Sequence, residues 1–349
     1  MGFLTTVPAL SDDAQSEPIG ANSCATSKAI IDYLSAKYSS SVAGVGLAIG
    51  VAIVSSQIDE LAIGFNLLIV APSRHFKSQL VNELRHIIDP GETIVHICSK
   101  DVTAHGLYRE THGDVDNKCM VYDDLTVTLA SKDVRTATRL ICMNTDLMDR
   151  RQYDYRDNIQ EFTIRGRMTF IGCMTTPSYK HRKTTFEELT LLPRLTVSHH
   201  EVPYIDLDTW EQDRIQRNRM SYTGPPIQIV QGSLDLDTVF NVDDWGRDLH
   251  EAVNRWTAFS GRPPNAVGDQ IRSFLAGHMI LNGRTQLVKE DFDYLMMCEP
   301  LFSLPTTEAR INTLRMQGMR PTNIARTLGI TRAAVSQHLK NARARGLNV

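Results

Sequence analysis

The stretch LLIVAPSRHFKS at residues 67–78 joins an apolar run to a polar loop and then to a helical pattern. The five apolar residues before Pro72 predict a strand buried on both faces, as in the middle of a parallel sheet. The pattern after the loop predicts a helix over residues 77–88, which a Pro-Gly pair at 90–91 ends. A strand, a loop and a helix in this order bring backbone amides and a helix N-terminus together, an arrangement that binds phosphate.

Short apolar runs of the same kind continue along the chain. They lie at residues 94–98, 118–122, 168–174 and 195–198, and helical or mixed stretches separate them. Strands that alternate with helices predict an α/β fold, a parallel sheet with helices on both faces. A helical apolar pattern over residues 26–58 precedes the first strand, so leading helices are expected there.

The remaining parts of the chain carry no strand pattern. Residues 1–25 are small and polar, and we expect them to be flexible. The predicted α/β domain follows at residues 26–205, and the other parts lie after it. Helical periodicity over residues 242–298 predicts a separate helical lid, which together with a linker occupies residues 206–300. Residues 301–349 form a third unit.

Charge is divided unevenly between these units. The whole chain of 349 residues has a net charge of −3. Residues 301–349 hold eight basic side chains and one acidic one, a net charge of +7, which leaves −10 for residues 1–300. A basic unit on an acidic body predicts a polyanionic partner such as nucleic acid at that end, although a solvated charged surface gives the same asymmetry.

Cysteine usage and hydropathy indicate the compartment. The six cysteines show no paired spacing of the metal-binding type and several lie in apolar runs, so we expect reduced thiols. No stretch resembles a secretory signal, and the apolar stretch at residues 42–54 is too short to cross a bilayer. A cytoplasmic protein without a membrane partner is expected.

The loop after the first strand is the candidate phosphate-binding site. It comprises Ala71, Pro72, Ser73, Arg74, His75, Phe76, Lys77 and Ser78. A lysine and a hydroxyl at its end are the groups that neutralise phosphate and bind Mg²⁺. The loop departs from the pattern GxxxxGK[ST] at Ala71 and at Phe76, where a side chain restricts the backbone that wraps the phosphate. An ordinary strand-turn-helix corner is the alternative interpretation.

Three later features supply further candidate catalytic groups. Asp123 and Asp124 follow an apolar strand, where the first acid can orient Mg²⁺ and the second can activate an attacking water. Thr176 lies at the tip of another predicted central strand, and Arg194 precedes the last strand. Acids at strand ends are common, so the Asp123-Asp124 pair is not specific by itself.

In this order, the four features resemble the AAA+ P-loop ATPase superfamily over roughly residues 40–300, and most nearly the minichromosome-maintenance helicases and the ATPases of phages and mobile elements. The resemblance implies ATP and Mg²⁺ as cofactors. It implies that Lys77 and Ser78 are the Walker A lysine and hydroxyl, and that Asp123 and Asp124 are the Walker B pair.

The same resemblance implies three further roles. Thr176 stands where relatives carry the sensor-1 asparagine, and Arg194 matches the arginine finger. A finger acts across a subunit boundary, so a ring-shaped homo-oligomer, in the family often a hexamer, is implied. A sensor-2 arginine is expected in the lid, and Arg272 is the nearest candidate.

The sequence PTNIARTLGITRAAVSQHL at residues 321–339 predicts a helix-turn-helix. Pro321 suits the start of the first helix, Gly329 the left-handed turn and Thr331 the cap of the second helix. A preceding helix near residues 307–318 would complete the unit. The predicted core consists of Ile311, Leu314, Ile324, Ala325, Leu328, Ile330, Val335 and Leu339.

The exposed face of the second helix is the candidate DNA-binding surface. Its residues are Arg332, Ser336, Gln337, Lys340 and Asn341, with Arg343 and Arg345 directed at the backbone. These side-chain types hydrogen-bond base edges and phosphates in a major groove. Resemblance to response-regulator and sigma-type modules favours DNA, and protein contacts through the same fold are the alternative.

Two functions are therefore expected. The first is an AAA+-like, ATP-dependent DNA-binding protein, a replication initiator or helicase-type motor of a phage or mobile element. The second is a non-catalytic DNA-binding regulator whose ATPase-like body serves as an oligomerisation or nucleotide-sensing scaffold. Phe76 favours the second function, whereas the Asp123-Asp124 pair and Arg194 favour the first.

Overall fold

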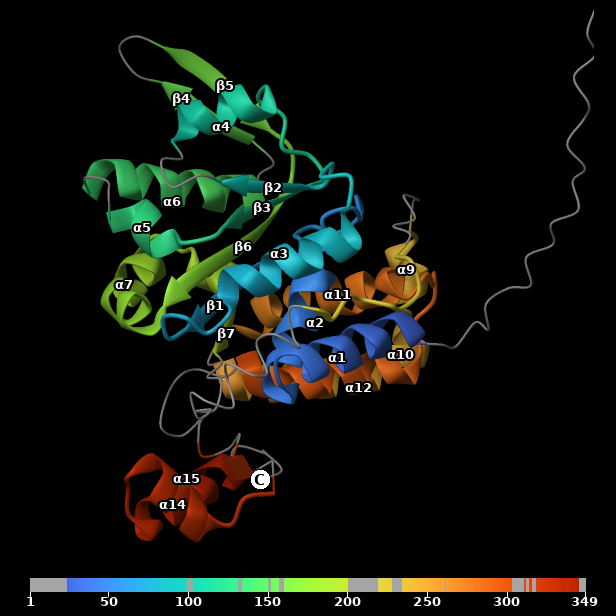
Figure 1. The fold of residues 1–349 in the computed structure, drawn as a ribbon, viewed down its shortest axis with the longest axis vertical. Coiled ribbons are helices and arrows are strands. Elements are labelled where there is room, and N and C mark those ends of the chain that lie inside the picture. Colours follow the sequence, from blue (N-terminus) through green and yellow to red (C-terminus); the bar gives the residue numbers. More distant parts are fainter. Residues whose placement is uncertain are drawn as a thin grey trace, which may run out of the picture.

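The structure is a computed structural model in which most of the chain is described (Figure 1). The described residues are 24–98, 103–130, 134–149, 152–156, 160–199, 219–227, 234–260, 262–302, 311, 314–315 and 318–344. Most of the predicted flexible segment and most of the predicted linker after residue 205 lie outside these ranges. Within the described ranges, no helix has the length and apolarity that crossing a bilayer requires.

A parallel sheet of five strands forms the centre of the molecule, as the sequence predicts. The strands run in the order β2-β3-β6-β1-β7. Their bounds are Leu67–Ala71 for β1, Val95–Cys98 for β2, Lys118–Tyr122 for β3, Met168–Thr175 for β6 and Thr196–His199 for β7. The strand predicted before Pro72 is β1. It lies between β6 and β7 and is buried at every position.

Helices cover both faces of this sheet. The helices up to β7 are α1 (Ala25–Lys37), α2 (Ser40–Ser55), α3 (Lys77–Ile88), α4 (Ala104–Thr111), α5 (Leu125–Ala130), α6 (Val134–Asp149), α7 (Thr176–Glu188) and the 3₁₀ turn η1 (Leu192–Arg194). Later helices are α9 (Leu236–Val239), α10 (Val242–Ser260), α11 (Pro264–Leu281), α12 (Lys289–Cys298), η2 (Glu299–Phe302), α14 (Pro321–Leu328) and α15 (Arg332–Ala344).

Alternation along β1 divides the core in two. Leu67 and Ile69 face α2, α3 and α11, whereas Leu68 and Val70 face α5, α6 and α7. Figure 1 shows the second group of helices on one side of the sheet and α3 with the α1–α2 and α10–α12 helices on the other. Helices on opposite faces of a parallel sheet are the expected α/β arrangement.

The helices expected to form a separate lid share their core with the first domain. Helix α2 contains no charged residue, so other elements must pack against all of its faces. Helix α11 packs along one of them. Gly277 permits this contact, because a Cβ there would lie 2.8 Å from the carbonyl oxygen of Val51. The sequence prediction missed this because helical periodicity shows that a face is buried but not which element covers it.

Sequence analysis also missed an antiparallel hairpin. Strands β4 (Gln152–Arg156) and β5 (Glu161–Arg165) pair outside the main sheet. Only one of their ten residues is buried, Ile164, so no apolar run marks them. Tyr155 and Phe162 stack across the hairpin with ring centroids 4.7 Å apart.

The C-terminal helices α14 and α15 have a small core of their own. Ile311, Ile324, Ala325, Val335 and Leu339 are buried in it, and Leu314, Leu328 and Ile330 pack against it. These are the residues that the sequence predicts. Most of the expected preceding helix lies outside the described residues.

Candidate functional site

The helices that follow β1 and β6 leave the sheet on opposite faces. Helix α3 follows β1 and packs in one core, whereas α7 follows the neighbouring strand β6 and packs in the other. The chain therefore diverges at the carboxyl ends of these two strands. In open α/β sheets this divergence opens the crevice in which ligands bind.

The candidate loop lies at this divergence of the chain and has an unusual backbone. Arg74 and Phe76 adopt left-handed conformations, with φ of 65° and 57°. Side chains other than glycine pay roughly 1–2 kcal/mol for such a conformation. The Phe76 ring packs against Tyr38, the residue that follows α1, with centroids 5.1 Å apart. Packing beneath the loop therefore holds Phe76 in the backbone conformation that glycine adopts freely, so its side chain does not prevent the loop from folding tightly.

Lys77 and Ser78 begin α3 at the end of the loop. The Lys77 ammonium donates to the carbonyl oxygens of Ala71 at 3.1 Å and Pro72 at 2.8 Å. Burial lowers the pKa of Lys77, and nearby Cys173 and Asp124 oppose this shift. Among the described residues, this half-buried ammonium is hydrogen-bonded to neutral carbonyls alone, which leaves positive charge available for an anion.

The acidic strand end reaches the same loop. The Ser78 hydroxyl donates to the backbone carbonyl of Asp123, 3.0 Å away, although the two residues are 45 positions apart. The Asp123 Oδ1 atom is buried and has no hydrogen-bond partner among the described residues. Burial raises the pKa of Asp123, Arg85 of α3 opposes the rise, and Asp124 adds to it. Such an uncompensated buried carboxylate oxygen suits a cation.

Asp124 has a structural role that the sequence did not reveal. Its Oδ1 atom accepts a hydrogen bond from the backbone N–H of Val127 at 3.2 Å, and its carbonyl accepts one from Thr128 N at 3.0 Å. The side chain thus caps the N-terminus of α5. A carboxylate in this place stabilises the helix whether or not it acts on a ligand.

Thr176 completes the group at the carboxyl edge. It is the first residue of α7, and the preceding Thr175 is paired in register with Ala71 of β1. The Thr175 hydroxyl donates to Ser178 Oγ at 2.9 Å. Thr176 therefore begins its helix beside the first residue of the candidate loop.

Arg194 and Arg272 lie near the amino ends of the strands, opposite the carboxyl ends at which the loop lies. Arg194 ends the turn before β7, whose first residue, Thr196, is paired with Leu67 at the start of β1. The length of β1, about 13 Å, therefore separates it from the loop. Its guanidinium binds Asp149, with Nε 2.5 Å from a carboxylate oxygen. Arg272 lines a cavity with Glu60 and Asp269, beside the segment that leads into β1.

A partly buried polar cluster around Glu83 lies beside Phe76 of the loop, and no pattern in the sequence indicated it. Glu83 of α3 accepts hydrogen bonds from Tyr33 and Lys37 of α1, the latter at 2.8 Å. Tyr38, which packs against Phe76, also donates to Glu83 at 3.4 Å. More than 40 positions separate these partners along the chain. No short-range pattern could therefore have indicated them.

The predicted DNA-contacting side chains lie on α15. Arg332, Ser336, Gln337, Lys340, Asn341 and Arg343 are all exposed. Residues four apart share a helix face, so Ser336 with Lys340 and Gln337 with Asn341 form adjacent rows. Gln337 Nε2 donates to Asn341 Oδ1 at 2.9 Å. Arg345 lies outside the described residues.

The turn between α14 and α15 has the geometry that its residue types predict. Gly329 is left-handed with φ of 64°, and the Ile330 N–H closes the turn on the carbonyl of Ala325 at 3.0 Å. Thr331 Oγ1 accepts from Ala334 N at 3.1 Å and so caps α15. This closure presents the exposed face of α15 to solvent.

The loop residues, Asp123, Asp124 and Thr176 thus lie together at the carboxyl ends of the strands. Arg194 and Arg272 lie near the amino ends. No family model matches the chain, and no curated protein is significantly similar to it. The roles of these residues are therefore argued from their geometry and chemistry.

Proposed function

We propose that this chain is an AAA+-like, ATP-dependent DNA-binding protein. The observation that carries the proposal is the hydrogen bond from the Ser78 hydroxyl to the Asp123 carbonyl, 3.0 Å long, at the divergence of β1 and β6. It joins a lysine-hydroxyl loop at a helix N-terminus to an acidic strand end. This combination is what binding of a nucleoside triphosphate with Mg²⁺ needs.

The residues at the edge fit such a ligand. Lys77 would neutralise phosphate oxygens, and the start of α3, which has no side-chain cap, would direct backbone amides at them. Ser78 and Asp123 offer the oxygen ligands that Mg²⁺ prefers, and the partnerless buried Oδ1 of Asp123 suits a cation. ATP with Mg²⁺ supplies a phosphoanhydride bond whose cleavage releases free energy. We propose Asp124 as the group that accepts a proton from water.

A ring-shaped oligomer of copies of this chain is part of the proposal. Arg194 lies about the length of β1 from the loop of its own chain. We propose that Arg194 acts on the nucleotide of a neighbouring copy, where a cation stabilises charge at the transferred phosphate. Release of Arg194 from Asp149 would accompany such assembly.

DNA binding is assigned to α14 and α15, which we propose form a helix-turn-helix. The exposed polar and basic residues of α15 have the size and chemistry to enter a major groove. The net charge of +7 over residues 301–349 supplies the attraction to phosphate. We propose a replication initiator or helicase-type motor of a phage or mobile element as the biological setting.

A non-catalytic DNA-binding regulator is the second candidate, and a specific observation favours it. Asp124 caps α5 through its carboxylate, which accounts for an acid at this position without catalysis. In that case nucleotide binding, or assembly alone, would serve to set the oligomeric state.

ATP turnover by the Asp124→Asn variant separates the two candidates. Asparagine is as good an N-cap as aspartate, so the fold and melting temperature should persist while the base is lost. For the motor, wild-type turnover rises with added duplex DNA, and Asp124→Asn lowers it by about 100-fold or more. Wild-type turnover no greater than that of the variant, with DNA binding intact, would leave only the regulator.

A further inference from the structure

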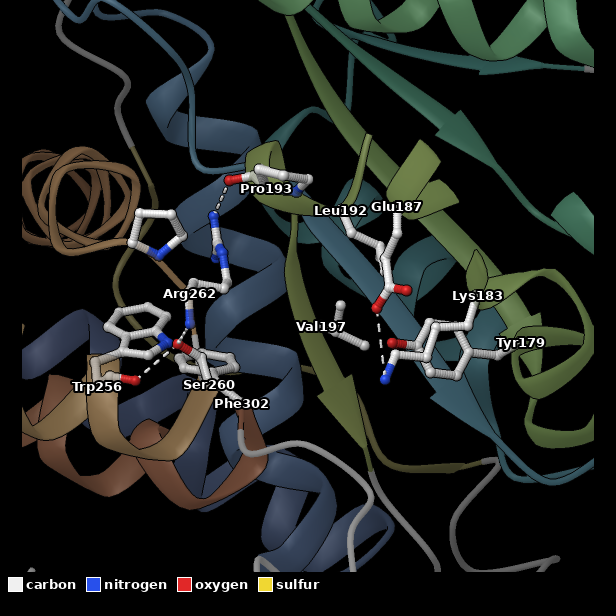
Figure 2. Close-up of a pocket in the computed structure, with 11 residues that line it drawn as sticks. Tyr179, Lys183, Glu187, Leu192, Pro193, Val197, Trp256, Ser260, Arg262 and Phe302 are labelled. Atoms are coloured by element: carbon white, nitrogen blue, oxygen red, sulfur yellow. Dashed lines mark hydrogen bonds and ion pairs between the residues drawn. The ribbon is translucent and has the colours of Figure 1, made fainter. Parts of the chain in front are cut away.

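A cavity of about 270 Å³ lies beside the edge strand β7, between α7 and the connection from α10 to α11 (Figure 2). Much of its wall is apolar. Trp256 and Phe302 stack with centroids 5.0 Å apart and form one side, and Leu192 and Val197 contribute to the other. An apolar cavity of about 150 Å³ already holds a benzene ring. There is thus room for a ring with one substituent.

The guanidinium of Arg262 is the unusual group in this wall. Its Nη2 atom donates to the carbonyl of Pro193, while Nε and Nη1 are buried and without a hydrogen-bond partner among the described residues. Burial lowers the pKa of Arg262 to about 10. The carboxylate among the lining residues, that of Glu187, is paired with Lys183 at 3.6 Å. Buried guanidinium groups are ordinarily matched by an anion, and the described part of the chain supplies none.

The start of α11 adds positive potential at the same end of the cavity. Pro263 is the N-cap of this 18-residue helix, and no side chain caps it. Ser260 Oγ accepts from the backbone N–H of Arg262 at 3.3 Å and fixes the turn. A helix N-terminus favours negative charge, so two independent groups at one end of an apolar cavity call for an anion.

We propose that this cavity is a binding site for a small ligand with a flat apolar body and one anionic group, of the chemistry of an aromatic carboxylate. The ring lies against Trp256 and Phe302, and the anion lies beside the guanidinium of Arg262, whose charge no described carboxylate neutralises. The site is separate from the loop at Lys77, because Pro193 and Val197 belong to the turn and strand next to Arg194. Its ligand is therefore not the nucleotide that the loop of the same chain would hold.

Calorimetric titration of the full chain with benzoate and with benzamide, its uncharged isostere, tests this site. The wild type should bind benzoate at least about 10-fold more tightly than benzamide, a difference of about 1.4 kcal/mol. Arg262→Gln should abolish that preference and leave benzamide binding unchanged. Arg247→Gln, which alters an exposed arginine of α10, is the matched control and should bind as the wild type does.

A second variant, Leu192→Trp, fills the cavity and should block both ligands. Thermal unfolding shows that the variants are folded, and Arg262→Gln should melt no lower than the wild type because it removes an unpaired buried charge. The proposal is overturned if benzoate does not bind at millimolar concentration. It is equally overturned if Arg262→Gln binds benzoate as tightly as the wild type, or if Leu192→Trp leaves benzoate binding unchanged.

Discussion

The loop at residues 71–78 and the surface of α15 are both proposed to meet phosphate, yet they are built differently. The loop is held by distant elements: Tyr38 lies against Phe76, and Asp123 accepts from Ser78. The surface of α15 depends on a core and a turn formed within its own stretch of sequence, with Gly329 and Thr331 closing the turn. A change in the loop should therefore affect the whole fold, whereas a change on α15 should affect one contact.

The largest stability effect is expected at Phe76. Phe76→Ala removes the ring from Tyr38 but keeps a Cβ in the left-handed conformation, so unfolding should need about 2–3 kcal/mol less free energy. Phe76→Gly loses the same ring but relieves the backbone, and it should be about 1 kcal/mol more stable than Phe76→Ala. Denaturant unfolding monitored by circular dichroism measures both. Equal stability of the two variants would show that the loop is not strained.

A smaller effect is expected on α15. Lys340→Gln removes one exposed positive charge, so it should weaken binding to duplex DNA of any sequence and lower the slope of log K against log salt by about 1. Gln337→Ala should instead alter sequence preference, because it leaves the charge unchanged. Fluorescence anisotropy at several salt concentrations checks this. Arg247→Gln on α10 is the control, and an equal loss there would argue against α15 as the surface.

The two regions also differ in how much of their structure could be predicted from the sequence. The α14–α15 turn could be predicted residue by residue, because its cap, its left-handed glycine and its buried positions are all local. The bounds of β1 and α3 were predicted for the same reason. A five-residue apolar run and an amphipathic helix are visible in single stretches.

The features that could not be predicted depend on contacts between distant residues. Helix α2 is apolar on every side, so its sequence could not show that α11 covers it. The cluster around Glu83 joins residues more than 40 positions apart, and Arg262 is notable because no carboxylate of the described residues is paired with it. Phe76 is the clearest case, because its residue type argues against a left-handed backbone, and the contact with Tyr38 that accompanies this backbone is not visible in the local sequence.

Binding of ATP in the presence of Mg²⁺, measured by titration calorimetry on the wild type and on Lys77→Ala, tests the central claim most directly. The ammonium of Lys77 is half-buried at the divergence of β1 and β6 and donates to the backbone carbonyls of Ala71 and Pro72. We expect wild-type binding that needs Mg²⁺ and a loss of at least about 10-fold in Lys77→Ala. Lys28→Ala, which removes an exposed lysine of α1, should bind as the wild type does. Equal affinity of the wild type and Lys77→Ala, or no binding by either, would contradict the account.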